Sequence, residues 1–143
     1  MKKDQERKEY RVPSDLSEVQ RASADILEFL KTVPLSEGGL FDVRLCLEEA
    51  LINAMKYGNR LCREVPVEVG VEYDAEEVRI RVKDQGPGFD VGKLADCTQA
   101  DNLLRTRGRG VYLIRKLMDR AEYNACGNEL LMVKRLPKRS GVR

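Results

Sequence analysis

The chain has 143 residues, of which 26 are basic and 24 acidic, and its net charge of +2 is too small to indicate nucleic acid or acidic lipid as the main partner. Hydrophobic residues make up 42% and charged residues 35%, proportions typical of a globular protein, so we expect residues 1–143 to form a single domain. The absence of histidine excludes a Ser-His-Asp triad, a histidine-rich metal site and a phospho-accepting histidine.

The N-terminal segment predicts a strand followed by a helix. Residues 1–9 are mostly charged and we expect them to be frayed, whereas residues 10–12 fit a short edge strand. Ser14 and Asp15, followed by Glu18, have the pattern of a helix N-cap with a capping-box partner. The buried side of this helix would carry Leu16, Val19, Ser23, Ile26 and Leu30.

A longer helix is predicted over residues 40–57, after a turn at residues 36–39. Its apolar stripe consists of Leu40, Val43, Leu47, Ala50, Ala54 and Tyr57. Gly58 and Asn59 follow the last residue of the stripe and would end the helix.

Alternating apolar and polar residues predict a β-hairpin in the middle of the chain. The apolar positions of its first strand are Val65, Val67, Val69, Val71 and Tyr73, and those of its second strand are Val78, Ile80 and Val82. Residues 74–77 would form the turn. Because neighbouring side chains of a strand point to opposite faces, this pattern implies a hairpin with one buried face.

The segment from 84 to 110 is rich in glycine and lacks periodicity, so we expect a long loop with one helical turn at residues 93–96. Long loops without regular structure are usually functional in compact domains. Regular structure is expected to return at Val111, where apolar residues again recur at helical spacing.

Two strands are predicted after that helix, at residues 121–126 and 130–136, joined by Gly127 and Asn128. The basic tail, residues 137–143, is expected to be frayed. The order of the elements predicts the α+β class, with helices packed on one face of a mostly antiparallel sheet.

The cysteines and the N-terminal residues indicate the cellular compartment of the protein. The four cysteines, Cys46, Cys62, Cys97 and Cys126, include no C-x-x-C pair, so structural zinc is not expected. Cys46 and Cys126 lie within apolar segments, where we expect them to be buried and reduced. The first eleven residues carry eight charges, and no apolar run is long enough for a bilayer. We therefore expect a cytoplasmic protein without a membrane partner.

Three polar segments are candidates for chemistry, and the first lies in the second helix. Glu49 and Asn53 are four residues apart and therefore share a helix face, with Lys56 about one turn further on. A carboxylate there could polarise a nucleophile, and an amide oxygen is a suitable ligand for Mg²⁺. A solvated helix face would supply the same pattern, so both interpretations stay open.

The second segment follows the hairpin, where Asp84, Gly86 and Gly88 occupy alternate positions after a strand. An aspartate at that point could accept a hydrogen bond from the amine of a base such as adenine, while the glycines let the backbone approach a ligand closely. A tight turn is the alternative explanation.

The third segment contains Arg107, Gly108, Arg109 and Gly110 and runs directly into the helix expected at Val111. Glycines at the start of a helix favour anion binding, and arginines add donors for phosphate. A solvated basic loop is the alternative. Neither a dinucleotide fingerprint nor a P-loop is present.

Together the three segments resemble the N-box and the two glycine boxes of the GHKL (Bergerat-fold) ATPases, in particular the small bacterial anti-sigma-factor serine kinases. Residues 49–54 look like the E-x-x-x-N-A helix, and residues 84–89 like the D-x-G-x-G-F/I loop. Residues 107–114 and 117–119 look like the R-G-x-G segment and the L-M-D that follows it. The resemblance extends over residues 10–136.

The resemblance implies a two-layer α/β sandwich, with helices on one face of a mixed, mostly antiparallel sheet and with ATP and Mg²⁺ held under a lid at residues 89–107. It implies the general base Glu49, the Mg²⁺ ligand Asn53 and the adenine-reading residue Asp84. The further ATP-binding residues would be Lys56, Gly86, Gly88, Arg107, Gly108, Arg109 and Gly110.

Two departures from the family pattern are visible. Asn128 and Glu129 stand where many members have threonines near the adenine, which puts that edge of the base pocket in doubt. Tyr57 and Gly58 replace a common His-Gly pair, which we interpret as a neutral packing change.

The resemblance implies an ATP-dependent serine protein kinase that phosphorylates an anti-sigma-factor antagonist and, as a homodimer, holds a sigma factor inactive. Direct contact with nucleic acid is not expected. Two alternatives remain: a non-catalytic switch in which the nucleotide orders the lid, and a simple ATPase whose nucleophile is water. Retention of Glu49 favours catalysis over the pure switch.

Overall fold

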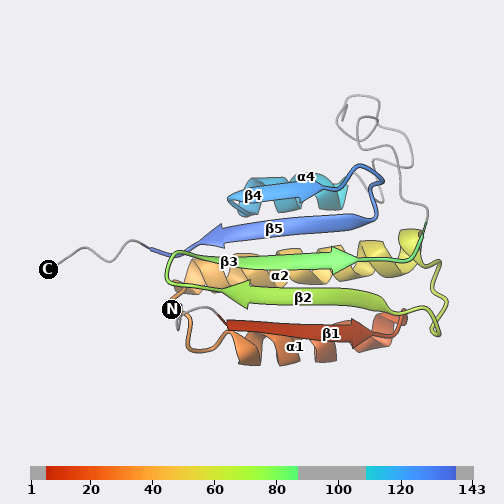
Figure 1. The fold of residues 1–143 in the computed structure, drawn as a ribbon, viewed down its shortest axis with the longest axis horizontal. Helices are drawn as coiled ribbons and strands as arrows, with labels where there is room; N and C mark the ends of the chain where they lie inside the picture. Colours follow the sequence, from red (N-terminus) through yellow and green to blue (C-terminus); the bar gives the residue numbers. More distant parts are fainter. Residues whose placement is uncertain (1–5, 87–108, 138–143) are drawn as a thin grey trace, which may run out of the picture.

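The computed structural model describes residues 6–86 and 109–137 of the chain. Its elements form two layers, a sheet and a layer of helices on one of its faces (Figure 1). The strands are β1 (Glu6–Val12), β2 (Val67–Tyr73), β3 (Glu77–Lys83), β4 (Arg120–Tyr123) and β5 (Glu129–Arg135). The helical elements are η1 (Leu16–Glu18), α1 (Val19–Phe29), α2 (Glu37–Asn53), η2 (Ala54–Gly58) and α4 (Arg109–Leu117).

The sheet has five strands in the order β1-β2-β3-β5-β4, and every pairing among the described strands is antiparallel. This confirms the α+β class and the two-layer sandwich. The expected β-hairpin is present as β2 and β3, with Val71 opposite Ile80 and Val69 opposite Val82. These four valine and isoleucine side chains are buried beneath the helices, as the alternation predicts.

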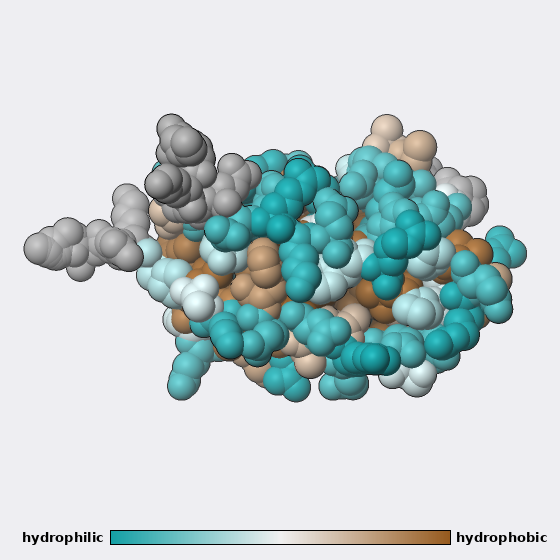
Figure 2. Space-filling view, turned by 60° about the horizontal axis from the view of Figure 1, so that its bottom comes forward, coloured by the Kyte–Doolittle hydropathy of each residue, from teal (hydrophilic) through white to brown (hydrophobic). Residues whose placement is uncertain are grey.

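The core lies between the sheet and the helices. Its fully buried side chains come from both layers and include Ile26, Leu47, Leu51, Ile80, Ile114 and Met132. The surface around the edge formed by β1 and α1 is mostly hydrophilic, with hydrophobic residues visible between the polar ones and toward both ends of the molecule (Figure 2). No helix among the described residues is long and apolar enough to cross a membrane.

Strand β1 begins at Glu6, which corrects the expectation that residues 6–9 are frayed and that only residues 10–12 are extended. Glu6 is paired with Tyr73 and Val12 with Val67, so the charged residues form part of the ladder. The prediction failed because β1 is an edge strand, where charged side chains are tolerated and the apolar alternation is weak.

The first helix starts with a 3-10 turn that Asp15 caps, since its carboxylate accepts a hydrogen bond from the Ser17 amide at 3.0 Å. Glu18 does not act as the capping-box partner that the sequence predicts. Its carboxylate lies 3.7 Å from the Arg21 guanidinium and 3.6 Å from that of Arg63. Leu16, expected to be buried, is 44% exposed, because the 3-10 turn changes its direction relative to the α-helical stripe.

Helix α2 begins earlier than expected, at Glu37, because the Ser36 hydroxyl caps it by accepting a hydrogen bond from the Gly39 amide at 2.9 Å. The predicted turn at residues 36–39 is therefore mostly helical. At its other end α2 continues into η2, a π-helix that ends with Gly58. The Asn59 amide donates to the Ala54 carbonyl, five residues earlier, at 2.9 Å.

The C-terminal helix and two strands are present close to the predicted positions, and Gly127 adopts the positive φ that the turn before β5 requires. The cysteine predictions were partly wrong. Cys46 is buried in α2, but Cys126 is exposed because it lies in the turn after β4 and not within the strand.

Candidate functional site

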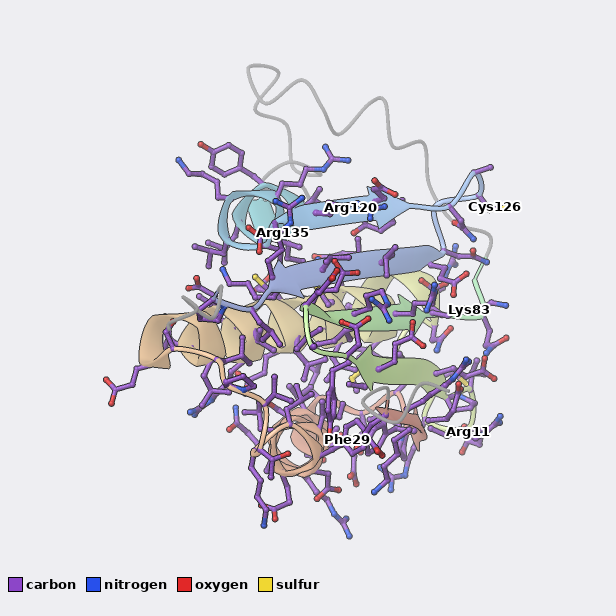
Figure 3. The ribbon with its side chains drawn as sticks, turned by 60° about the vertical axis from the view of Figure 1, so that its left-hand side comes forward. Arg11, Phe29, Lys83, Arg120, Cys126 and Arg135 are labelled. Carbon is purple, nitrogen blue, oxygen red and sulfur yellow. The ribbon has the colours of Figure 1, made fainter. Side chains whose placement is uncertain are left out.

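The sequence-predicted site residues that the structure describes gather at one end of the sheet, around the end of β3, the end of α2 and the start of α4. Lys83, the last residue of β3, lies at the same end as Cys126, while Arg135 at the end of β5 lies toward the other (Figure 3). This placement follows from the antiparallel ladder, in which Lys83 pairs with Glu129 and Glu77 with Arg135.

Glu49 and Asn53 of α2 face the start of α4. A Cβ atom built on Gly110 would lie 2.5 Å from Glu49 Oε1 and 2.9 Å from Asn53 Nδ2. Real Cβ atoms do not approach their neighbours that closely, so a side chain at position 110 would displace the ends of these two polar side chains, and glycine lets the backbone of α4 begin directly against them. Two of the sequence segments, 61 residues apart at Glu49 and Gly110, thereby form one site.

The Asn53 side chain is buried, with 5% of the residue exposed, and its Nδ2 atom has no hydrogen-bond partner among the described residues. A buried amide without a partner costs free energy, and a water molecule or a ligand can supply the missing contact. Rotation of the amide can present either its oxygen or its nitrogen. The side chain therefore fits the role of Mg²⁺ ligand that the resemblance implies.

Within the described residues no three side chains of the histidine, cysteine, aspartate and glutamate types form a cluster for a metal ion. An ion at Asn53 would therefore take most of its ligands from water and phosphate, which is the coordination that Mg²⁺ usually has in nucleotide sites. Asn53 and the neighbouring carboxylate of Glu49 are the residues that would face it.

Asp84 follows β3 and is buried, with only 4% of the residue exposed. Gly58, at the end of η2, packs against it so closely that a Cβ atom at Gly58 would overlap the Asp84 carboxylate carbon. Gly86 is equally tight, since a Cβ there would overlap the Gly58 carbonyl oxygen. The two glycines leave a narrow space in which a carboxylate is held at the end of a strand.

The backbone at residues 84–86 is fixed by neighbouring groups. The Asp84 amide donates to the Asn128 carbonyl at 3.0 Å, and the Gly86 amide donates to the Asp84 Oδ1 atom at 2.8 Å. The Asn128 side-chain amide donates to the Gly86 carbonyl at 3.3 Å. Asn128, one of the two departures from the family pattern, therefore supports this loop by its backbone and its side chain.

Glu129, the other departure, lies with Glu68 and Lys83 around a hollow of the sheet. Alternation along β5 places it on the face opposite Leu130, whose side chain is in the core beneath the helices. Glu129 is therefore not positioned at the edge of the Asp84 site.

The remaining predicted residues are placed differently. Lys56 is exposed, whereas Asn53 is buried, and the Lys56 Nζ atom lies 5.4 Å from the centre of the Tyr57 ring. The backbone of Arg109 forms the first residue of α4. Gly88, Arg107, Gly108 and the lid at residues 89–107 lie outside the described residues.

Asn59 is a residue of the site whose role the sequence did not indicate. Its Oδ1 atom accepts a hydrogen bond from the Gln85 amide at 2.7 Å. From the sequence it could only be assigned to the end of the helix, because a Gly-Asn pair is an ordinary helix terminator. The long-range contact to Gln85 depends on how η2 meets β3.

One family model matches the chain, and its description is histidine kinase-like ATPase domain; the match extends over residues 12–134. That segment runs from the last residue of β1 to the penultimate residue of β5, and it contains every described residue of the site. No curated protein matches the chain with significance.

Proposed function

The chain belongs to the histidine kinase-like ATPase family, and from this premise we propose that it is an ATP-dependent serine protein kinase that also binds a sigma factor. Its protein substrate would be an anti-sigma-factor antagonist, and it would act as a homodimer in the cytoplasm. The partners, the homodimer and the compartment rest on the resemblance of the three sequence segments to the anti-sigma-factor kinases.

The observation that carries the kinase proposal is the position of Glu49 against the start of α4. The Glu49 carboxylate is within contact distance of the position that a Cβ atom on Gly110 would occupy. It therefore lies beside the first backbone amides of α4. Such amides favour a phosphate group. A proton acceptor next to a phosphate-binding helix start is the arrangement that phosphoryl transfer requires.

In the proposed reaction, Glu49 accepts the proton of a serine hydroxyl on the bound partner. The serine oxygen forms a bond to the γ-phosphorus of ATP while the bond from that phosphorus to the oxygen bridging the β- and γ-phosphates breaks, so ADP carries away the electron pair. Asn53 would hold Mg²⁺, which supplies charge neutralisation at the phosphates when bound. Asp84 would accept a hydrogen bond from the amine of adenine.

The test is transfer of labelled γ-phosphate to a protein that is retained by this chain in the presence of Mg-ATP, followed by identification of the modified residue. The wild-type protein is expected to label a serine. Glu49→Gln keeps the size and helix propensity of the side chain but removes the proton acceptor, so it should bind ATP and partner normally and transfer phosphate about 10²–10⁴-fold more slowly.

Two results would redirect the proposal. Release of inorganic phosphate without labelling of any partner would indicate the simple ATPase. Retention of the partner by both proteins, with neither transfer nor hydrolysis, would indicate the nucleotide-dependent switch.

A further inference from the structure

Asn59 is a buried side chain that joins three segments of the chain at the Asp84 site. Only 5% of the residue is exposed. Its Nδ2 atom donates to Ser14 Oγ at 2.9 Å, to the Val65 carbonyl at 3.0 Å and to the Pro66 carbonyl at 3.2 Å. Its Oδ1 atom accepts from the Gln85 amide. Both ends of the amide are therefore in use.

The two ends of Asn59 contact parts of different character. The nitrogen end is held by the segment that enters β2 and by Ser14, whose own hydroxyl donates to the Val65 carbonyl at 2.5 Å. This part of the fold serves as a support for Asn59, because it leads directly into β2, which is hydrogen-bonded to β1 from Val67 onward. The oxygen end holds the backbone immediately after Asp84, so Asn59 connects that support to the loop.

The Gln85 side chain is exposed, so the hydrogen bond from Asn59 acts on the backbone of the loop and not on a side chain. The Asp84 amide and the Gly86 carbonyl are held from the other side by Asn128. With the Asn59 contact removed, the loop would lose the contact that ties the Gln85 backbone to the segment before β2. The hydrogen bond that the Asp84 carboxylate accepts from a ligand would then be less well directed, and hydrogen bonds weaken steeply away from linearity.

We propose that Asn59 is a positioning residue that fixes the direction of the Asp84 carboxylate and thereby sets the preference of the site for a purine that carries a 6-amino group. The proposal rests on the proposed function, in which Asp84 binds the adenine of ATP. It adds a residue that does not touch the nucleotide but determines which base is accepted.

The experiment compares the affinities of ATP and of purine riboside triphosphate, which lacks the 6-amino group, by calorimetry on the full chain. The wild-type protein should bind ATP more tightly. In Asn59→Ala the ratio of the two affinities should fall about tenfold toward one, because a misdirected carboxylate no longer distinguishes the ligands. An unchanged ratio would overturn the proposal.

Ser14→Ala is the matched control. It removes a hydrogen bond from the same buried network but leaves the acceptor for Gln85 in place, so it should lower the unfolding midpoint without changing the ratio of affinities. A merely structural role of Asn59 predicts the same result for both variants, with ATP and purine riboside triphosphate weakened equally. If Asn59→Ala does not fold, Asn59→Ser, whose shorter side chain leaves the Gln85 amide without its acceptor, is measured in the same way.

A double-mutant cycle tests whether Asn59 acts through Asp84. Asp84→Ala, which removes the acceptor, should by itself bring the affinity ratio close to one, and Asn59→Ala added to it should change the ratio no further. A further fall in the double variant would overturn the proposal.

The wild-type protein separates a failure of the proposed function from a failure of this inference. If it binds neither ligand, the proposed function is itself wrong and the inference falls with it. Equal binding of both ligands by the wild type would reject only the role of Asp84 and Asn59 in base selection.

Discussion

Gly58 and Asp84 are packed so closely that a methyl group on Gly58 would overlap the Asp84 carboxylate carbon. The contact joins the end of η2 to the end of β3, and the lack of a side chain at Gly58 creates the room in which the carboxylate sits. The site therefore depends on a glycine that has an ordinary backbone conformation and is required for space alone.

Gly58→Ala is expected to displace Asp84 and to destabilise the fold by about 1–3 kcal/mol, the usual cost of overpacking a buried position. ATP affinity should fall as well, because the displaced carboxylate is the proposed base contact. Urea unfolding and calorimetry measure the two effects. The matched control is Gly38→Ala in α2, where a Cβ meets no atom within 4 Å and where alanine should stabilise the helix by roughly 0.5–1 kcal/mol. Normal ATP binding by Gly58→Ala would contradict the assignment of Asp84.

Asn53→Ala should remove the effect of Mg²⁺ on ATP affinity. The unfolding free energy of the ligand-free protein should stay within about 1 kcal/mol of wild type, because the variant loses a buried amide nitrogen that has no partner among the described residues. Calorimetric titrations with Mg²⁺ and with a chelator give the first quantity, and urea unfolding gives the second. In the chelator the two proteins should bind ATP alike. A persistent Mg²⁺ effect in the variant would exclude Asn53 as the metal ligand.

The fold could largely be predicted from the sequence because its signals are local. Alternation in β2 and β3 and helical spacing in α1, α2 and α4 reflect one buried face each, and these elements lie close to the predicted residues. β1 was underestimated because an edge strand pairs on one side and needs little apolar alternation.

The candidate site residues could be named from the sequence, but the contacts that the structure gives them could not. Glu49, Asn53 and Asp84 were identified by their spacing and by resemblance, whereas Asn59 was not, because its partners Ser14 and Gln85 are 45 and 26 residues away. A polar residue at a helix end has the same local pattern whether it faces water or a distant backbone amide. Only the meeting of η2 with β3 distinguishes the two cases.

The Glu72–Arg79 pair on the sheet predicts a dependence of stability on pH. Arg79 Nε donates to Glu72 Oε2 at 2.7 Å, and this hydrogen bond lowers the pKa of Glu72. A carboxyl group whose pKa is lower in the folded state stabilises the protein above its unfolded pKa of about 4.3, and this stabilisation is lost as the pH falls through the folded value. Arg79→Met should therefore cost roughly 1–3 kcal/mol at pH 7, with the difference from wild type shrinking in acid.

Urea unfolding at pH 7 and at successively lower pH measures that difference. Lys31→Met is the control, because Lys31 and Glu28 form a similarly short ion pair of 2.6 Å on an exposed helix surface, where such pairs contribute little. An Arg79→Met deficit that stays constant from neutral to acid pH would exclude the Glu72 carboxyl as its source.

Cys46 should be unreactive toward thiol reagents in the folded protein. Burial raises its pKa to about 12, so the reactive thiolate is scarce at neutral pH, and the side chain is inaccessible. Mass spectrometry after labelling at pH 7.5 should find the same number of modified thiols in native wild type and in Cys46→Ala, with one more in wild type after unfolding in urea. Cys62 and Cys126 are exposed and serve as internal positive controls. One extra label on native wild type would show that α2 opens.

The π-helical turn of η2 also sets the direction of the residues that follow it. A π-turn contains one more residue than an α-turn, so relaxation of residues 54–58 into an α-helix at the same chain length would rotate every later residue by about 100° around the helix axis. Gly58 would turn away from Asp84 and Asn59 away from Gln85, although no site residue had been altered. The contacts of Gly58 with Asp84 and of Asn59 with Gln85 therefore depend on the number of residues per turn in η2 as well as on the side chains themselves.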